Sequence, residues 1–388
     1  MPESKRLIDL VQSRIDEFLM SRETIVTLIS SDLTPLTDFS RQFLSGGKRF
    51  RAQFCYWGAQ SVRAADTGPD AGQSGAKTPA AAAGRRGAAS TAPVPLEAVV
   101  SAASALEIFH AAALVHDDII DNSDTRRGAP SAHKLFESLH ENEGWSGGPV
   151  TFGRASAILL GDLLLGWSDE LLDEGLDAVA DRPSARRARL EFNHMRTEVT
   201  AGQYLDILEE RAWLAQPESQ LLDRALRVIV YKSAKYSVQA PLVIGAALAG
   251  ASADQLSSLR AFGLPLGMAY QLRDDLLGVF GDAAVTGKPS GDDLTEGKRT
   301  VLIALARERL NDRDRQALDA QLGDPTLDQA QIRALQELIT ASGAVERVET
   351  LIAAQVAEAL NSLETAPITA TARQTLLDLT DRVTRRAY

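Results

Sequence analysis

Apolar residues recur at intervals of three and four along most of the chain, the spacing that places them on one face of an α-helix. No run alternates polar with β-branched residues as a half-buried strand would, so the pattern predicts an all-α fold. The predicted helices span residues 6–29, 50–62, 96–120, 155–172, 185–208, 220–249, 253–279 and 300–310, with two or three more between 328 and 387.

One segment departs from this pattern. Residues 64–95 contain no Leu, Ile, Met or aromatic side chain and are rich in Ala, Gly, Pro and Ser. Such a composition cannot bury much apolar surface. We therefore expect a flexible insertion between two helices, serving as a spacer without a chemical role.

Composition narrows the class of protein. With 41 Lys and Arg against 52 Asp and Glu, the net charge is −11. This balance argues against non-specific nucleic-acid binding, which needs a basic surface. Cys55 is the single cysteine, which excludes an intrachain disulfide. The first twenty residues mix acids and bases unlike a signal peptide, and the apolar stretch 240–251 is shorter than the roughly 20 residues of a membrane span. We expect a soluble cytoplasmic protein.

The stretch LVHDDIIDNSDTRRG, residues 114–128, carries the strongest chemical signal. On a helix, Asp117 and Asp121 lie one turn apart on one face, and Asp118 and Asp121 form an i,i+3 pair. Their mutual repulsion would be relieved by a metal ion, and all-oxygen ligands suit Mg²⁺. Acidic triplets on helices are more often solvated faces, but the apolar run before this one favours a cavity.

A second acidic cluster lies far downstream in AYQLRDDLLGVFGD, residues 269–282. Gln271, Asp274 and Asp275 have i, i+3, i+4 spacing and share a helical face. Two helices that each present an aspartate pair predict two acidic walls with several Mg²⁺ ions between them.

Basic residues accompany both clusters. Each alone is more often a surface cation, but cations that face a metal-filled acidic pocket suit a substrate with several phosphates. The candidates are Lys48, Arg51, Arg126, Arg127, Lys232, Lys288 and Lys298.

In these motifs the chain closely resembles the trans-isoprenyl diphosphate synthases, also called polyprenyl synthetases. The resemblance runs over nearly the whole chain, from GGKRFR to the C-terminal RRAY. The motifs in order are GGKRFR at 46–51, the segment from His110 to Gly128 with its HDDIID and RRG, GD at 161–162, KS at 232–233, QLRDD at 271–275, GK at 287–288 and EGK at 296–298.

The resemblance implies that residues 1–388 form a single polyprenyl synthetase domain, a large helical bundle around a deep central cavity, in a homodimer. It also implies a Mg²⁺-dependent prenyltransferase of isoprenoid biosynthesis. Such an enzyme condenses isopentenyl diphosphate head-to-tail with an allylic diphosphate, giving an all-trans polyprenyl diphosphate.

The resemblance further implies roles for single residues. The metal ligands would be Asp117, Asp118, Asp121, Asp274 and Asp275, and catalysis would depend on Asp117, Asp121, Asp274 and Lys232. The allylic diphosphate would meet Arg126, Lys232, Lys288 and Lys298, flanked by Ser233 and Gln271. The isopentenyl diphosphate would meet Lys48, Arg51, His110 and Arg127. For His116 we expect a core or metal-supporting role.

One position departs from the family pattern. The second acidic motif of the family usually reads DDxxD, whereas this chain has DDLLG, with Gly278 in place of the last aspartate. One possible metal ligand is lost, and we expect the loss to be tolerated.

The residues before the first acidic cluster bear on product length, because one helical turn rises about 5.4 Å, close to one isoprene unit. Ala112 and Ala113 lie one turn before Asp117 and are small, while Phe109 lies about two turns before it. We predict a geranylgeranyl (twenty-carbon) product, with a longer polyprenyl chain as the alternative.

Two other functions remain to be weighed. A non-catalytic partner subunit of such a synthase is suggested only by Gly278. A terpene cyclase also uses paired acidic helices, but it needs no isopentenyl diphosphate site, and the GGKRFR and RRG motifs argue against it.

Overall fold

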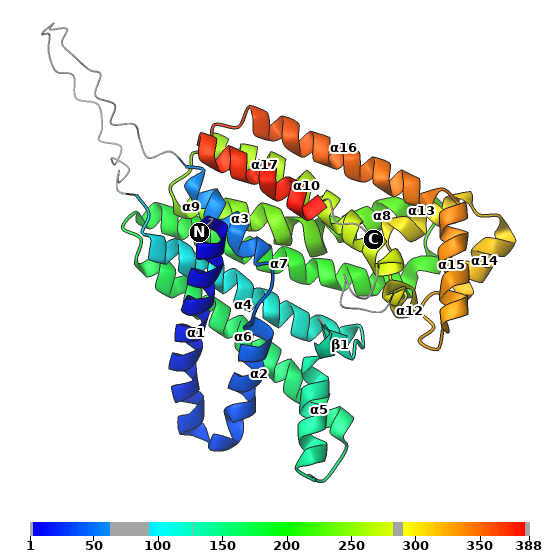
Figure 1. Cartoon of the computed structure of the whole chain (residues 1–388), viewed down its shortest axis with the longest axis horizontal. Helices are drawn as coiled ribbons and strands as arrows, with labels where there is room; N and C mark the ends of the chain where they lie inside the picture. The colour runs from blue at the N-terminus through cyan, green and yellow to red at the C-terminus, as the bar shows by residue number, and fades with distance from the viewer. Residues whose placement is uncertain (1–2, 63–92, 127, 282–289, 385–388) are drawn as a thin grey trace, which may run out of the picture.

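The computed structural model describes residues 3–62, 93–126, 128–281 and 290–384, and these ranges are almost entirely helical (Figure 1). The first half contains α1 (Glu3–Ile29), η1 (Ser31–Leu33), α2 (Thr34–Leu44), α3 (Phe50–Gln60), α4 (Leu96–Ile120), β1 (Thr125–Arg126), β2 (Ala129–Pro130), α5 (Ala132–Asn142), α6 (Pro149–Asp177) and α7 (Arg182–Ala212). The second half contains η2 (Trp213–Ala215), η3 (Glu218–Gln220), α8 (Leu221–Val228), η4 (Ile229–Gln239), α9 (Ala240–Leu248), α10 (Ala253–Phe280), α12 (Asp292–Glu296), α13 (Val301–Arg309), α14 (Asp312–Gln321), α15 (Gln329–Ala341), α16 (Ala344–Glu364) and α17 (Ala370–Thr384).

The all-α prediction is confirmed, with one small addition and several missed elements. The strands β1 and β2 form a two-residue antiparallel hairpin after α4. The predicted helix 220–249 is divided into α8, the π-helical η4 and α9. Helices α2, α5 and α14, of ten or eleven residues each, were not predicted. The insertion predicted at 64–95 lies almost wholly outside the described residues.

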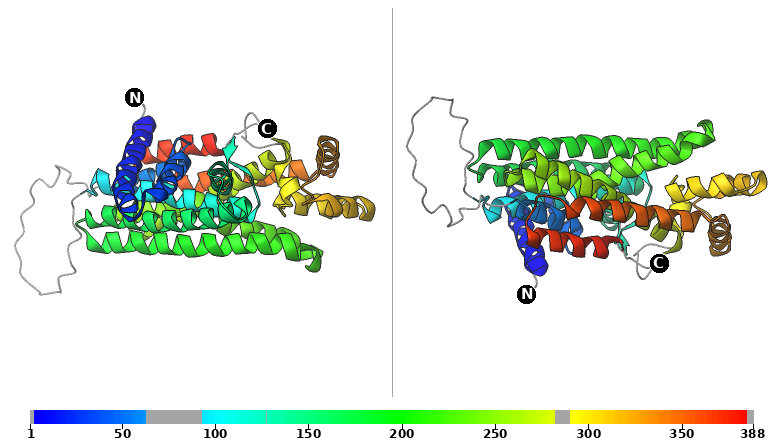
Figure 2. Two further views of the ribbon diagram at one scale, coloured as in Figure 1. Left: turned by 90° about the horizontal axis from the view of Figure 1, so that it is seen from below. Right: turned by 90° about the horizontal axis from the view of Figure 1, so that it is seen from above.

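Helix α4 runs through the main core. It packs against α1, α3, α6 and α9, and nearly every residue from Ala98 to Phe109 is buried. Alanines at 98, 102, 103 and 105 let these neighbours approach closely on all sides of the helix. The long helices α4, α6, α7 and α10 run roughly along the long axis of the molecule (Figures 1 and 2). The burial of α4 thus fixes the position of its C-terminal end, which carries the first acidic cluster.

Helix α10 links this core to a second one. Its first half, including Leu259 and Phe262, packs into the main core. Its second half, including Leu272 and Leu276, packs against α13 and α16 and belongs to a second apolar core that also includes residues of α8 and α15. The second acidic cluster therefore lies on the half of α10 that belongs to the second core.

Two of the described helices, α4 and α6, have the length and apolar composition of a membrane span. Two such helices are weak evidence for a membrane protein, because buried core helices share these properties. For α4, 83% of the apolar stretch is buried inside the protein, whereas for α6 only 33% is.

Candidate active site

A cavity of about 750 Å³ lies between α3, α4, α7, η4, α10 and α12. It collects side chains that are far apart in the sequence. The predicted site residues that line it are Lys48, Arg51, His110, Asp117, Asp121, Arg126, Lys232, Ser233, Gln271, Asp274, Asp275 and Lys298. Arg127 and Lys288 lie outside the described residues, and among the predicted site residues that are described only Asp118 does not line the cavity.

The first acidic wall is the C-terminal end of α4, where Asp117 and Asp121 face the cavity. A helix C-terminus carries a partial negative charge, so carboxylates are unfavourable there unless cations balance them. The cations come from elsewhere in the fold: Lys232 from η4, Lys298 from the segment after α12, and Arg126 from β1. Burial raises the pKa of Asp117, but these three cations outweigh it and lower that pKa to about 2.

Lys232 bridges α4 and α7. Its Nζ lies 3.3 Å from Asp117 Oδ1 and 2.5 Å from Asp206 Oδ2. A side chain at Gly202 on α7 would collide with the backbone of Lys232, so this glycine permits the close packing of α7 on η4. The sequence analysis missed Asp206, although Gln203, Asp206 and Glu210 share one helical face and could have been found by the same spacing argument.

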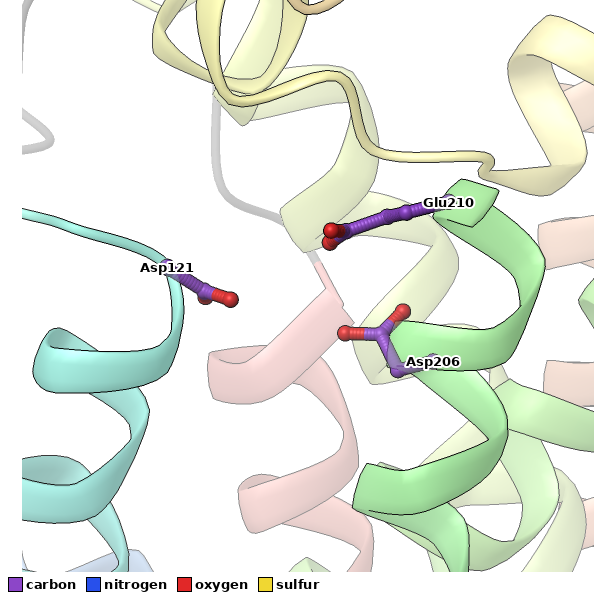
Figure 3. Close-up of side chains that lie close together, drawn as sticks. All are labelled: Asp121, Asp206 and Glu210. Atoms are coloured by element: carbon purple, nitrogen blue, oxygen red, sulfur yellow. The ribbon is translucent and has the colours of Figure 1, made fainter. Parts of the chain in front are cut away.

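Lys298 sits among three carboxylates. Its Nζ lies 2.7 Å from Asp121 Oδ1, 3.4 Å from Asp206 Oδ2 and 3.2 Å from Glu210 Oε1. Figure 3 shows that Asp121 approaches from α4, whereas Asp206 and Glu210 approach from α7. One oxygen of each carboxylate lies within 4.8 Å of the others, a spacing and donor type that fit a divalent cation such as Mg²⁺.

Asp118 has a different place from the one predicted for it. It is fully buried behind the cavity wall, and Arg126 donates from Nε to its Oδ1 at 2.8 Å. The β1–β2 hairpin turns the chain back so that Arg126 reaches this carboxylate and still lines the cavity. This placement does not support direct metal binding by Asp118; it supports a role in holding Arg126 at the first wall.

The second acidic wall is formed by residues 271–275 of α10, where Gln271, Asp274 and Asp275 face the cavity. Gln271 donates from Nε2 to Asp275 Oδ1 at 2.8 Å. Burial raises the pKa of Asp275 to about 7, since Gln271 and the more distant Lys232 offset it only in part. The two walls line the same cavity, as the spacing of the motifs predicted.

The GGKRFR loop and the start of α3 form a basic part of the cavity wall. Arg49 is buried and donates from Nη1 to Glu107 Oε2 at 3.3 Å, while Glu107 Oε1 accepts from the backbone N–H of Ala52 at the start of α3. This anchoring places Lys48 and Arg51 on the cavity wall. Arg49 and Glu107 thus have structural roles that the sequence analysis did not assign.

A polar cluster supports Arg51. Its guanidinium lies 4.3 Å from the ring centre of Tyr236 and donates from Nη2 to Ser237 Oγ at 2.8 Å. The Tyr236 hydroxyl lies 2.9 Å from His110 Nδ1. His116 instead turns toward α6, where its Nε2 lies 3.3 Å from the carbonyl of Ile158.

The three residues considered for product length differ in whether they line the cavity. Ala113 lines the cavity, whereas Ala112 and Phe109 are buried in the main core. The Phe109 ring packs edge-on against Phe192, with centroids 6.0 Å apart, and against Tyr236, with centroids 5.8 Å apart. Of these three positions, only Ala113 presents its side chain to the space beside the first acidic wall.

Comparison with known proteins agrees with this geometry. The family model for polyprenyl synthetase matches residues 34–339, which is most of the chain. The chain belongs to the polyprenyl synthetase family. The alternative of a terpene cyclase is thereby set aside, and the predicted transfer of prenyl groups is confirmed at the level of the family.

Individual polyprenyl synthetases are similar over much of their length. A geranylfarnesyl diphosphate synthase of Natronomonas pharaonis is 30% identical over 75% of this chain and 76% of its own. A geranylgeranyl diphosphate synthase of Saccharolobus solfataricus is 31% identical over 63% of this chain and 66% of its own. A crystal structure of the Corynebacterium glutamicum geranylgeranyl pyrophosphate synthase, complexed with isoprenyl diphosphate and magnesium, is 36% identical, covers 98% of this chain and 99% of its own, and superposes with a TM-score of 0.86.

Proposed function

We propose that the protein condenses isopentenyl diphosphate head-to-tail with an allylic diphosphate in this cavity, with several Mg²⁺ ions between the acidic walls. The observation that carries the proposal is that Asp121 and Asp274, from distant parts of the chain, line one cavity that Lys48 and Arg51 also line. Acidic residues suited to a metal and further cations in one cavity suit two diphosphate substrates held side by side.

The acidic walls would hold the allylic diphosphate through the metal. Asp117 and Asp121 from α4 would bind Mg²⁺ on one side, and Asp274 and Asp275 from α10 on the other. When bound, Mg²⁺ acts as a Lewis acid that stabilises negative charge on the departing diphosphate. Lys232, Lys298 and Arg126 surround the same space and would stabilise that charge directly.

The basic part of the cavity wall would position the second substrate. Lys48 and Arg51 would bind the isopentenyl diphosphate, and the contacts of Arg51 with Tyr236 and Ser237 fix its guanidinium before any ligand arrives. Such positioning holds the carbon–carbon double bond against the allylic carbon and replaces a bimolecular encounter with an oriented one. The apolar residues Ala113, Leu114 and Val199 on the cavity wall would exclude water from the allylic cation.

We propose geranylgeranyl diphosphate as the product. Ala113 leaves the space beside the first acidic wall open, so a chain longer than ten carbons meets no bulky side chain at that position. Several similar proteins are named geranylgeranyl diphosphate synthases, although others are named for shorter or longer products.

A homodimer is also part of the proposal. Helix α6 is long and apolar, yet much of it is exposed, including Val150, Ile158 and Leu159. An apolar helix face of this kind is typical of a surface covered by a second copy. Gel filtration with light scattering should give twice the mass of the chain, and Leu159→Glu should reduce it.

The assay uses the purified chain alone, with Mg²⁺, labelled isopentenyl diphosphate and dimethylallyl, geranyl or farnesyl diphosphate in turn. We expect a twenty-carbon product and complete loss of synthesis in excess EDTA. Failure to elongate any primer would contradict the proposed activity and favour a non-catalytic partner subunit.

A further inference from the structure

The backbone carbonyl of Lys48 is held by Gln53, which lies one turn into α3. Gln53 is fully buried, and its Nε2 donates to the carbonyl of Lys48 at 2.6 Å. The chain around Lys48 needs such a contact, because Gly46, Gly47 and Arg49 all have positive φ, of +67°, +90° and +50°. A left-handed conformation at a residue other than glycine is strained and persists only where surrounding contacts hold it. The direction of the backbone at Lys48 therefore depends on Gln53.

The other side of the Gln53 amide is contacted by Arg382, near the end of α17. Arg382 Nη1 donates to Gln53 Oε1 at 3.2 Å, and its guanidinium carbon lies 5.7 Å from the ring centre of Phe50. An arginine can only donate and a backbone carbonyl can only accept, so these two neighbours admit a single orientation of the amide between them. Arg382 thus fixes the orientation in which Gln53 donates to Lys48.

The end of α17 is itself attached to the helix of the second acidic wall. Helix α17 packs against α3, α10 and α16 (Figure 1). Arg273 directly precedes Asp274 on α10, and its Nε donates to the carbonyl of Thr384 at 3.1 Å. Its Nη1 and Nη2 donate to the two carboxylate oxygens of Glu349 on α16, at 2.6 and 2.7 Å. Arg382 is therefore carried by a helix turn whose position relative to α10 is fixed.

We propose that Arg382 is a positioning residue for isopentenyl diphosphate: it acts through Gln53 to orient the backbone at Lys48, and so places the Lys48 ammonium for the diphosphate. The inference rests on the proposed function of the cavity. Of these three described residues, Lys48 lines the cavity, whereas Gln53 and Arg382 do not. Arg382 therefore affects the substrate through the loop and not by contact. The site proposed for the allylic diphosphate includes neither Gln53 nor Arg382, so binding of that substrate should be spared.

The test compares the Michaelis constants of the two substrates, with Mg²⁺, isopentenyl diphosphate and farnesyl diphosphate as the primer. Arg382→Ala should raise the KM for isopentenyl diphosphate by about five- to tenfold, the loss expected for one hydrogen bond from a charged donor. The KM for farnesyl diphosphate and kcat should stay within about twofold of the wild type. Because Arg382 is exposed, the Tm should change by less than about 2 °C. Gln374→Ala, at an exposed position of the same helix, is the matched control and should behave as the wild type.

Further variants test whether Arg382 acts through Gln53. Gln53→Met has a side chain of similar length that forms neither contact, and it should raise the KM for isopentenyl diphosphate at least as much as Arg382→Ala does. In the Gln53→Met background, Arg382→Ala should add less than about a further twofold, because two residues that act in series are not additive. Arg382→Lys keeps a donor at a place where no bidentate pair is formed, and its KM should lie within about threefold of the wild type.

The outcomes are distinguishable. An unchanged KM for isopentenyl diphosphate in Arg382→Ala would overturn the inference and leave the proposed function standing. Equal increases in the KM of both substrates would indicate a general disturbance of the fold, and would overturn it as well. A full second increase in the double variant would show that Arg382 acts independently of Gln53, which also contradicts the inference. Wild-type protein that elongates no primer would overturn the proposed function together with the inference.

Discussion

The two acidic walls of the cavity differ in how their charge is balanced. At the first wall, Lys232, Lys298 and Arg126 lie among the carboxylates and lower the pKa of Asp117 to about 2, despite its burial. At the second wall, burial dominates and raises the pKa of Asp275 to about 7. Asp117 of the first wall is therefore ionised at neutral pH by the protein's own cations, although burial and the neighbouring Asp117 raise the pKa of Asp121. Asp275 of the second wall exchanges a proton near neutrality. A metal ion that binds the second wall must displace that proton.

The largest effects should come from removing one carboxylate from either wall. Asp117→Ala and Asp274→Ala should each lower kcat by about 10³-fold, because each removes a group that stabilises the departing diphosphate through the metal. Asp254→Ala, which removes an exposed acid from the first turn of α10, is the control and should retain full activity. Steady-state rates of product formation measure the effect. An unchanged rate in either variant would contradict a catalytic role for that acidic wall.

A second prediction concerns the cations of the first wall. Lys298→Ala would leave Asp121, Asp206 and Glu210 close together without the ammonium between them, and should lower the free energy of unfolding by about 3 kcal/mol. Added Mg²⁺ should restore more stability to this variant than to the wild type, since a divalent cation can replace the lost charge. Urea unfolding with and without Mg²⁺ measures both effects. Lys134→Ala, whose ion pair with Glu137 lies on α5, is the control.

The raised pKa of Asp275 gives a third prediction, in which a substitution stabilises the folded protein instead of destabilising it. The folded protein holds a proton on Asp275 that the unfolded chain has released, so stability falls as the pH rises from 3.8 to about 7 and stays low above it. Asp275→Asn removes this penalty and should raise the Tm of the metal-free protein by about 2–4 °C at pH 8.5, and by less at pH 5. Thermal unfolding in EDTA at the two pH values tests this, and an equal effect at both would contradict the assigned pKa.

The last prediction concerns substitutions at Ala113, which should change the length of the product with the smallest change in stability. Ala113→Phe fills space beside the first wall and should shorten the product, while Ala113→Val should have an intermediate effect. Chromatography of the dephosphorylated products measures their lengths. An unchanged distribution in Ala113→Phe would place the growing chain elsewhere in the cavity.

Much of the site follows from local spacing along the chain. The positions of Asp117, Asp121, Asp274 and Asp275 on two helix faces are set by helical periodicity, and the sequence predicted that they would meet in one cavity. Periodicity does not say which of several neighbouring aspartates turns inward. Asp118 was grouped with the ligands for that reason, although it lies behind the wall with Arg126.

Other parts of the site depend on packing that no local pattern encodes. The π-helical winding of η4, which carries Lys232 and Tyr236, cannot be told from an α-helix by its apolar spacing. Asp293 also lines the cavity but lies in a polar stretch of the sequence, and its placement depends on the burial of Leu294 and on the two glycines that bound α12. Helices α2 and α5 were missed because short amphipathic segments resemble loops until a partner surface is known.

Helix α12 also makes the two sides of the cavity mechanically dependent on each other. Asp293, beside Gly278 of α10, and Lys298, among the carboxylates of the first wall, are joined by a hydrogen bond of 3.0 Å from the N–H of Lys298 to the carbonyl of Asp293. A ligand that displaces the backbone of Lys298 also displaces the backbone of Asp293, which couples the two sides. Occupancy at one side should therefore alter affinity at the other, a cooperativity within a single protomer that arises from one turn of helix.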